Sequence, residues 1–217
     1  MNKYAYPKIT NAAFRLNTLS DKLIDELLAE YRSSTKEKLF DYATERKILP
    51  FIAYLMCSLD QDLEYWKPIT KNYTLRNENI VNRLDEVFSA LMYNRVKKVF
   101  VSQNFGALLT GGKDISLFAS GDVDLFGSLL ESDAINDAFL SLGYKSIDQF
   151  CGKKLISTSY QNEMLLPNKF SFCIEYATLS RQKLPNPINA ETFVDWNCLK
   201  TYSNTSIVLP PLEALLY

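Results

Sequence analysis

The chain has 217 residues, 47% of them hydrophobic, a formal net charge of −1 at pH 7 and no histidine. This length and composition suit one large or two small soluble globular domains, and the charge gives no global attraction to nucleic acids or anionic membranes. Without imidazole, Ser-His-Asp and Cys-His catalysis, the H-E-x-x-H zinc site and a histidine general base are excluded. Any chemistry must rest on carboxylates, Lys, Tyr or a metal bound through oxygen.

The start of the sequence and its cysteines indicate the compartment. No window approaches about 18 uninterrupted apolar residues, and Met1–Tyr4 is not followed by the apolar region of a signal peptide. We therefore expect a cytoplasmic protein without a membrane segment. Cys57, Cys151, Cys173 and Cys198 form no C-x-x-C pair, so we expect them to be reduced, buried core residues.

The first 95 residues are predicted to be helical. Ser20 is the expected start of one helix, the capping-box pattern of Ser34–Glu37 opens a second, and Pro50 begins a third. A fourth and longest helix is predicted over 75–95. Its apolar residues follow one stripe: Ile80, Leu84, Val87, Phe88 and Leu91. Such stripes indicate a helical core.

From Val96 onward the hydrophobic period changes. The elements predicted there, in order, are a strand at 99–101, a short helix at 105–109 before Gly111-Gly112, a strand around Asp122, a helix near 132–142 capped by Ser132 or Asp133 and ended by Gly143, and strands at 144–149, 154–160 and 169–179. This mixture predicts an α+β fold, in which a small mixed sheet flanked by helices follows an N-terminal helical region.

The last part of the sequence is punctuated by proline. Pro185 and Pro187 indicate a linker, and Pro210-Pro211 precedes Leu212–Tyr217, which is typical of the first turns of a helix cut off by the chain end. We therefore expect three regions: a helical region at 1–95, a mixed core at 96–180 and a truncated C-terminal segment at 181–217.

Two carboxylates stand one residue apart in the predicted strand Ser120–Phe126. Alternation along a strand places Asp122 and Asp124 on one face and Val123 on the other. Adjacent carboxylates raise each other's pKa unless a cation lies between them. The competing interpretation is a solvated turn in which the two acids cap neighbouring amides. Asp60-Gln61-Asp62 has the same spacing but no surrounding strand pattern.

A third carboxylate lies in the segment Phe170–Thr178. Alternation places Glu175 on one face, between the small residues Cys173 and Ala177, which leaves space for a ligand. If this strand pairs beside the strand of Asp122, three carboxylates converge. Three acidic oxygens suit Mg²⁺ better than a softer metal. For Glu175 alone, the competing interpretation is an exposed strand residue or an ion-pair partner.

This order of elements resembles the nucleotidyltransferase superfamily with the polymerase-β-like core. It is more closely similar to a bacterial family of uncharacterised nucleotidyltransferases, which carry a helical region before that core. The resemblance covers about 75–217. It is carried by Gly121-Asp122-Val123-Asp124-Leu125, Leu142-Gly143-Tyr144, Ile174-Glu175-Tyr176 and Leu209-Pro210-Pro211-Leu212-Glu213.

The resemblance implies transfer of a nucleoside monophosphate from an NTP to a small-molecule or protein acceptor. Asp122, Asp124 and Glu175 would be catalytic and would bind Mg²⁺ in a two-metal site, with Glu175 holding the metal at the acceptor or acting as the base. The nucleotide would contact the turn and helix start that precede the acid strand, and the glycine directly before that strand. These nucleotide-binding residues are Ser102, Gln103, Asn104, Gly106 and Gly121.

Four positions depart from the family pattern. Gln103-Asn104 stands where the family has Lys-Gly, Phe118 replaces an arginine, and Tyr176 replaces a histidine. Two further hypotheses therefore stand beside an active enzyme. One is a catalytically weak or inactive relative that binds nucleotide or a protein partner, and the other is a helical interaction protein in which the acidic pair is incidental.

Overall fold

The computed structural model describes residues 6–15, 18–165, 170–178, 188–189 and 196–210. The chain divides into two compact units, Met1–Asn77 with Ile115–Ala119, and Glu78–Asp114 with Ser120–Tyr217. The division falls inside α5 (Leu63–Tyr93), whereas the sequence analysis ended the helical region at residue 95. The predicted linker at Pro185 and Pro187 and the predicted helix at Leu212–Tyr217 lie outside the described residues.

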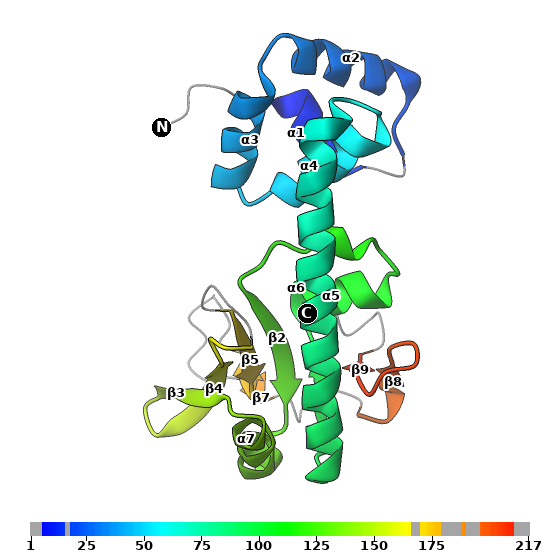
Figure 1. Cartoon of the computed structure of the whole chain (residues 1–217). Coiled ribbons are helices and arrows are strands. Elements are labelled where there is room, and N and C mark those ends of the chain that lie inside the picture. Colours follow the sequence, from blue (N-terminus) through cyan, green and yellow to red (C-terminus); the bar gives the residue numbers. More distant parts are fainter. Residues whose placement is uncertain (1–5, 16–17, 166–169, 179–187, 190–195, 211–217) are drawn as a thin grey trace. The chain divides into compact units, whose positions relative to one another are not determined.

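The first unit is helical. It contains α1 (Pro7–Ala13), α2 (Asp21–Arg32), α3 (Lys36–Glu45), α4 (Leu49–Ser58), the first part of α5 and the 3₁₀ helix η1 (Ile115–Leu117) (Figure 1). Ser20 caps α2 as predicted, because its side chain accepts a hydrogen bond from the Leu23 amide. The cap of α3 is Thr35, one residue later than the capping-box pattern indicated. Ser34 instead exchanges a hydrogen bond with the Tyr6 hydroxyl.

Helix α5 begins at Leu63, so the prediction that it starts at residue 75 was wrong. Pro68 lies near its beginning, where a missing amide donor costs only one hydrogen bond. Trp66 is fully buried in the helical core, and its Nε1 donates to the Tyr31 hydroxyl at 2.9 Å. The Tyr31 hydroxyl in turn donates to Asp62. Asp60 and Asp62 lie between α4 and α5 and not on a strand, and Asp62 is a hydrogen-bond partner of the helical core.

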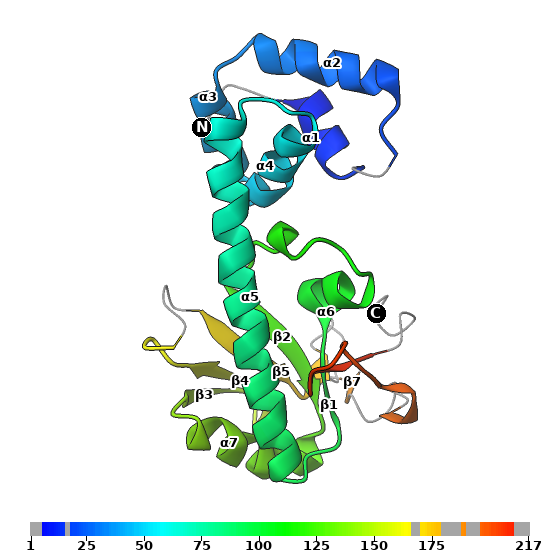
Figure 2. The ribbon, with the colours of Figure 1, turned by 45° about the vertical axis from the view of Figure 1, so that its right-hand side comes forward.

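The second unit contains a five-stranded mixed sheet with the order β1-β2-β5-β4-β3 (Figure 2). Its strands are β1 (Val99–Val101), β2 (Asp122–Gly127), β3 (Lys145–Cys151), β4 (Lys154–Gln161) and β5 (Ser171–Glu175). Strands β2 and β5 are parallel, and the other neighbouring pairs are antiparallel. The expected α+β class with a mixed sheet is confirmed. The described residues also form two short antiparallel strand pairs outside this sheet. They are β6 (Ala177–Thr178) with β7 (Ile188–Asn189), and β8 (Lys200–Thr201) with β9 (Val208–Leu209).

The connections of this unit are helical. They are α6 (Gln103–Thr110), α7 (Ser132–Ser141) and the 3₁₀ helices η2 (Leu129–Glu131) and η4 (Trp196–Cys198). The N-cap of α7 is Glu131, without a side-chain hydrogen bond, so the predicted caps Ser132 and Asp133 were wrong. Gly143 follows α7 with a φ of 81°, as a helix-ending glycine requires. No helix in the described ranges combines the length and apolarity needed to cross a membrane.

One face of the sheet packs into an aromatic core. Figures 1 and 2 show α7 and the last turns of α5 alongside the strands. Phe139 of α7 stacks on Tyr160 of β4, with ring centroids 3.9 Å apart and planes 9° apart. Tyr160 and Tyr176 are both fully buried, so they are core residues, as aromatic strand residues usually are. The opposite face of β2 and β5 carries the acidic residues.

Candidate active site

The parallel pairing of β2 with β5 brings the three predicted carboxylates to one face of the sheet. Asp122 is in register with Ser171, Asp124 with Cys173, and Phe126 with Glu175. Because register partners in a sheet share a face, Asp122, Asp124 and Glu175 project from the same side. The burial pattern agrees, since these acids are half-buried whereas Val123 and Ile174, which point the other way, are fully buried. The pairing of these two strands, on which the predicted convergence of the three carboxylates depended, is present in the structure.

The electrostatics of this face show that the three acids influence one another. Burial first, and then the nearby charge of Asp122, raise the pKa of Asp124 to about 6. The pKa of Glu175 is also raised, first by burial and then by the charge of Asp124. Ser120 donates a hydrogen bond from its hydroxyl to Asp122 Oδ1. A cation on this face would relieve the repulsion.

Glu175 is held by a residue of α6. Gln103 Nε2 donates to Glu175 Oε1 at 3.4 Å, and this hydrogen bond opposes part of the rise in the glutamate's pKa. Gln103 has a φ of 50°, a left-handed conformation that costs a residue with a Cβ about 1–2 kcal/mol. At the start of α6 the left-handed residue is therefore Gln103, and Asn104 is not among the described residues with positive φ.

Ser102 connects the turn before α6 to the acid strand. Its amide donates to the Asp124 carbonyl at 2.9 Å, and its carbonyl accepts from Gly106 at 3.1 Å. The side chain is 3% exposed, and its Oγ has no hydrogen-bond partner in the described part of the chain. A buried hydroxyl without a partner is costly, so Ser102 is a candidate ligand contact.

Two predicted nucleotide contacts, Asn104 and Gly121, lie on the surface. Asn104 is exposed at the start of α6, in the turn that follows β1. Gly121 is exposed just before β2, its carbonyl accepts from the Ser171 amide at 3.3 Å, and a Cβ added there would meet no atom within 4 Å. The structure therefore leaves open space at Gly121.

Strand alternation had placed Cys173 on the face of Glu175 as a small neighbour, but its contacts with Ser159 and Asp124 were not predicted. Cys173 lies on the acid face beside Asp124, and its Sγ accepts a hydrogen bond from the Ser159 hydroxyl at 3.8 Å. Burial raises the pKa of this thiol to about 11, and the three carboxylates add to the rise. These contacts depend on the pairing of β5 with β2 and β4, which alternation along one strand does not predict.

The expectation that the cysteines are buried core residues was wrong for those with described side chains. Cys57 and Cys173 are half-buried, Cys198 is exposed, and all three are free thiols. Each of the two half-buried thiols lies near a hydroxyl, Thr70 for Cys57 and Ser159 for Cys173. Because a thiol can form weak hydrogen bonds with such hydroxyls, it does not require complete burial.

Two residues that depart from the family pattern have structural roles. Phe118 is buried in the helical unit, where the Arg76 guanidinium lies 5.9 Å from its ring centroid. Tyr176 is 1% exposed, and its amide donates to the Ile156 carbonyl at 2.9 Å. Neither side chain is on the acid face of the sheet.

The acids offer oxygen ligands, the type that Mg²⁺ prefers. Among the residues that the structure describes, no group of three or more His, Cys, Asp or Glu side chains is arranged to hold a metal ion. In this conformation the three acids share one face of the sheet without forming a metal cluster. The third acid, Glu175, accepts a hydrogen bond from Gln103.

Comparison with known proteins gives little further information. No family model and no curated protein matches the chain. Among solved structures, the chain is similar to the solution structure of the antibiotic-resistance factor ANT(2'')-Ia, at 10% sequence identity and a TM-score of 0.44. The alignment covers 64% of this chain and 69% of that one.

Proposed function

We propose that the chain is a Mg²⁺-dependent nucleotidyltransferase that moves a nucleoside monophosphate from an NTP to a small molecule or protein. The observation that carries this proposal is the parallel register of β2 and β5, which places Asp122, Asp124 and Glu175 on one half-buried face. The order of elements, which resembles the polymerase-β-like core, supports the same assignment. A reaction that rests on carboxylates also agrees with the absence of histidine.

The donor chemistry of the acid face suits magnesium. The pKa of Asp124 is raised by burial and by repulsion from Asp122. A divalent cation bound beside it would stabilise the charged carboxylate and so offset both effects. Asp122 and Asp124 would hold the metal at the triphosphate, and Glu175 would hold a second one at the acceptor. Magnesium bound there would neutralise phosphate charge and lower the pKa of the acceptor group.

The chain's own residues would then orient the reactants. The buried hydroxyl of Ser102 would donate to a phosphate oxygen near the start of α6, where the helix dipole favours negative charge. As the alternative to holding that metal, Glu175, whose pKa is raised, would itself take the proton of the acceptor hydroxyl or amine. The acceptor atom forms its bond to the α-phosphorus as the bond to the pyrophosphate breaks.

One contact favours a second candidate, a nucleotide-binding protein with little or no turnover. Gln103 donates to Glu175 Oε1, an oxygen that an active enzyme would need for a metal or a proton. Gln103-Asn104 also stands where the resembling family has Lys-Gly, so the lysine charge toward phosphate is missing. Such a protein would bind an NTP through Asp122 and Asp124 without releasing pyrophosphate.

Calorimetric titration of the full chain with each of the four NTPs, with and without Mg²⁺, tests both candidates. We expect magnesium-dependent binding that Asp122→Asn and Asp124→Asn abolish. Asp137→Asn, an exposed carboxylate on α7, is the matched control and should bind as the wild type does. Absence of NTP binding at millimolar ligand would overturn both candidates. Pyrophosphate release with a panel of acceptors separates the enzyme from the binding protein.

A further inference from the structure

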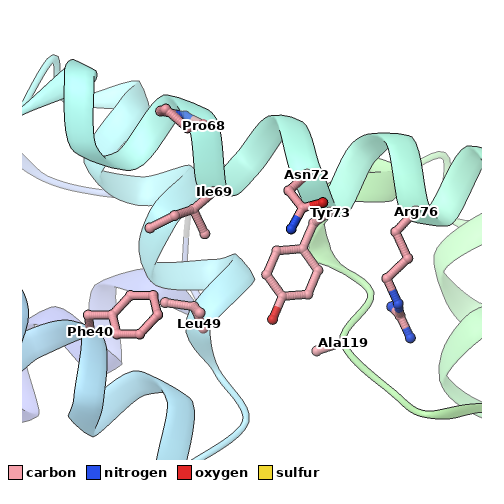
Figure 3. A pocket seen from close by; sticks show the side chains of 8 residues that line it. All are labelled: Phe40, Leu49, Pro68, Ile69, Asn72, Tyr73, Arg76 and Ala119. Atoms are coloured by element: carbon pink, nitrogen blue, oxygen red, sulfur yellow. The ribbon is translucent and has the colours of Figure 1, made fainter. Parts of the chain in front are cut away.

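The helical unit contains a pocket of about 520 Å³ that the proposed reaction does not use (Figure 3). This volume lies within the range of about 300–1,000 Å³ typical of small-molecule sites. The lining comes from α3, α4, α5 and the segment Ile115–Ala119, all within this one unit. The residues are Phe40, Leu49, Pro68, Ile69, Asn72, Tyr73, Arg76 and Ala119.

One end of the pocket is apolar. Figure 3 shows the side chains of Phe40, Leu49 and Ile69 close to one another at that end. Leu49 belongs to the buried helical core, and Phe40 and Ile69 are half-buried against it. This end would cover the hydrocarbon or aromatic part of a ligand.

The other end carries a fixed positive charge. Arg76 Nη1 donates to Asn77 Oδ1 at 2.9 Å and to the Phe118 carbonyl at 3.4 Å. Asn77 is fully buried, and its Nδ2 donates to the carbonyls of Ile115 and Phe118 at 2.7 and 2.9 Å. These hydrogen bonds fix the side chain of Asn77. Because the Arg76 guanidinium donates to that side chain, its position is fixed as well.

The environment of this charge favours an anion. Burial lowers the pKa of Arg76, which means that the guanidinium is partly removed from water. Burial raises the pKa of Tyr73, so its phenol stays protonated at neutral pH and is a donor on the same helix. An anionic group here would form charge-assisted hydrogen bonds in a medium less polar than water, where they are strongest.

We propose that this pocket binds a small organic carboxylate with an apolar body, its carboxylate at Arg76 and Tyr73 and its body against Phe40 and Ile69. The rigid guanidinium at one end and the apolar wall at the other define this ligand class. The proposal does not depend on the nucleotidyltransferase reaction, because none of its residues belongs to the acid face of the sheet.

A pair of probes tests the proposal on the full chain. 4-Phenylbutyrate carries the carboxylate, and 4-phenylbutyramide has nearly the same shape without the charge. We expect calorimetry to show the carboxylate binding at least about tenfold more tightly than the amide, as a charge-assisted hydrogen bond predicts. Amide chemical shifts should change at Ile69, Tyr73 and Ala119. Equal affinities, shift changes only outside the pocket, or no binding of the carboxylate at about 10 mM would overturn the proposal.

Variants test the role of the guanidinium. Arg76→Gln should remove the preference for the carboxylate, whereas Arg76→Lys should keep part of it because the charge remains. Lys71→Gln removes an exposed charge from α5 outside the lining and should leave both affinities unchanged. Ile69→Trp should fill the apolar end and weaken both probes. An Arg76→Gln chain that keeps the wild-type preference would overturn the assignment, and the wild-type comparison of the two probes holds even if a variant does not fold.

Discussion

Gln103 Nε2 donates to Glu175 Oε1 across 3.4 Å and so joins the first residue of α6 to the last residue of β5. The two residues are far apart in sequence, and both belong to the predicted site. Their contact makes the charge of the third acid depend on the conformation at the start of α6.

Removing the glutamine side chain should raise the pKa of Glu175 further. The hydrogen bond from Gln103 favours the charged form of the carboxylate, so Gln103→Ala leaves burial and the charge of Asp124 unopposed. Carbon-detected NMR titration of the glutamate carboxyl group measures this change. Asn104→Ala is the control and should leave the titration unchanged. An unaltered midpoint in Gln103→Ala would contradict the role of the hydrogen bond.

Glycine at position 103 should stabilise the fold. The φ of 50° is strained for glutamine and is freely adopted by glycine, so Gln103→Gly should gain about 0.5–1 kcal/mol in the free energy of unfolding. Asn104→Gly, where φ is not positive, should instead lose about the same amount from helix entropy. Urea denaturation of both variants provides the comparison. The same sign of change in both would mean that φ does not decide the effect.

Asp124→Asn should be more stable than the wild type at neutral pH. The folded chain raises the pKa of Asp124 from 3.8 to about 6, so the folded state binds more protons than the unfolded state between these values. The free energy of unfolding of the wild type therefore falls as pH rises through this interval. The full shift corresponds to about 3 kcal/mol, and partial exposure to water reduces the expected gain to about 1–2 kcal/mol at pH 7.

The pH dependence of that gain is the control. At pH 3.5 the wild-type carboxyl is mostly protonated in both states, so the two chains should be nearly equally stable there. Denaturation curves at pH 3.5, 5 and 7 measure the trend. A gain that does not change with pH would exclude the charge of Asp124 as its cause.

Gly127→Ala should destabilise the sheet unit. An added Cβ would lie 3.0 Å from Ile174 Cγ2 and 3.1 Å from Ile135 Cδ1, closer than packed carbon atoms normally approach. We expect a loss of about 1–2 kcal/mol in the free energy of unfolding. Gly121→Ala is matched to it, because its Cβ would meet no atom within 4 Å. Thermal denaturation that shifts both variants equally would be inconsistent with this packing.

Asn77→Ala should destabilise the helical unit by about 2–4 kcal/mol. The substitution leaves the carbonyls of Ile115 and Phe118 without the amide that donates to them, in a fully buried place. Asn82→Ala, on the exposed side of the same helix, should cost little. Urea denaturation followed by tyrosine and tryptophan fluorescence distinguishes the two. Equal small losses would show that the buried hydrogen bonds are not important for stability.

Much of the fold could be predicted from the sequence because it rests on local interactions. Alternation in β2 and β5 assigned Asp122, Asp124 and Glu175 to one side of their strands, and Ser20 and Gly143 marked the ends of helices. The beginning of α5 was missed because Pro68 argues against a helix. The contacts of Trp66 with the helical core outweigh one missing hydrogen bond.

By itself, the sequence determined the order of the main helices and sheet strands and which face each acid occupies, because these depend on the nearest neighbours along the chain. Only the tertiary structure decided that β2 lies parallel to β5, that Gln103 contacts Glu175, and that the buried Asn77 holds Arg76 at the end of a pocket. These are contacts between distant segments. Their partners are selected by the packing of whole elements, which leaves no period or short motif in the sequence.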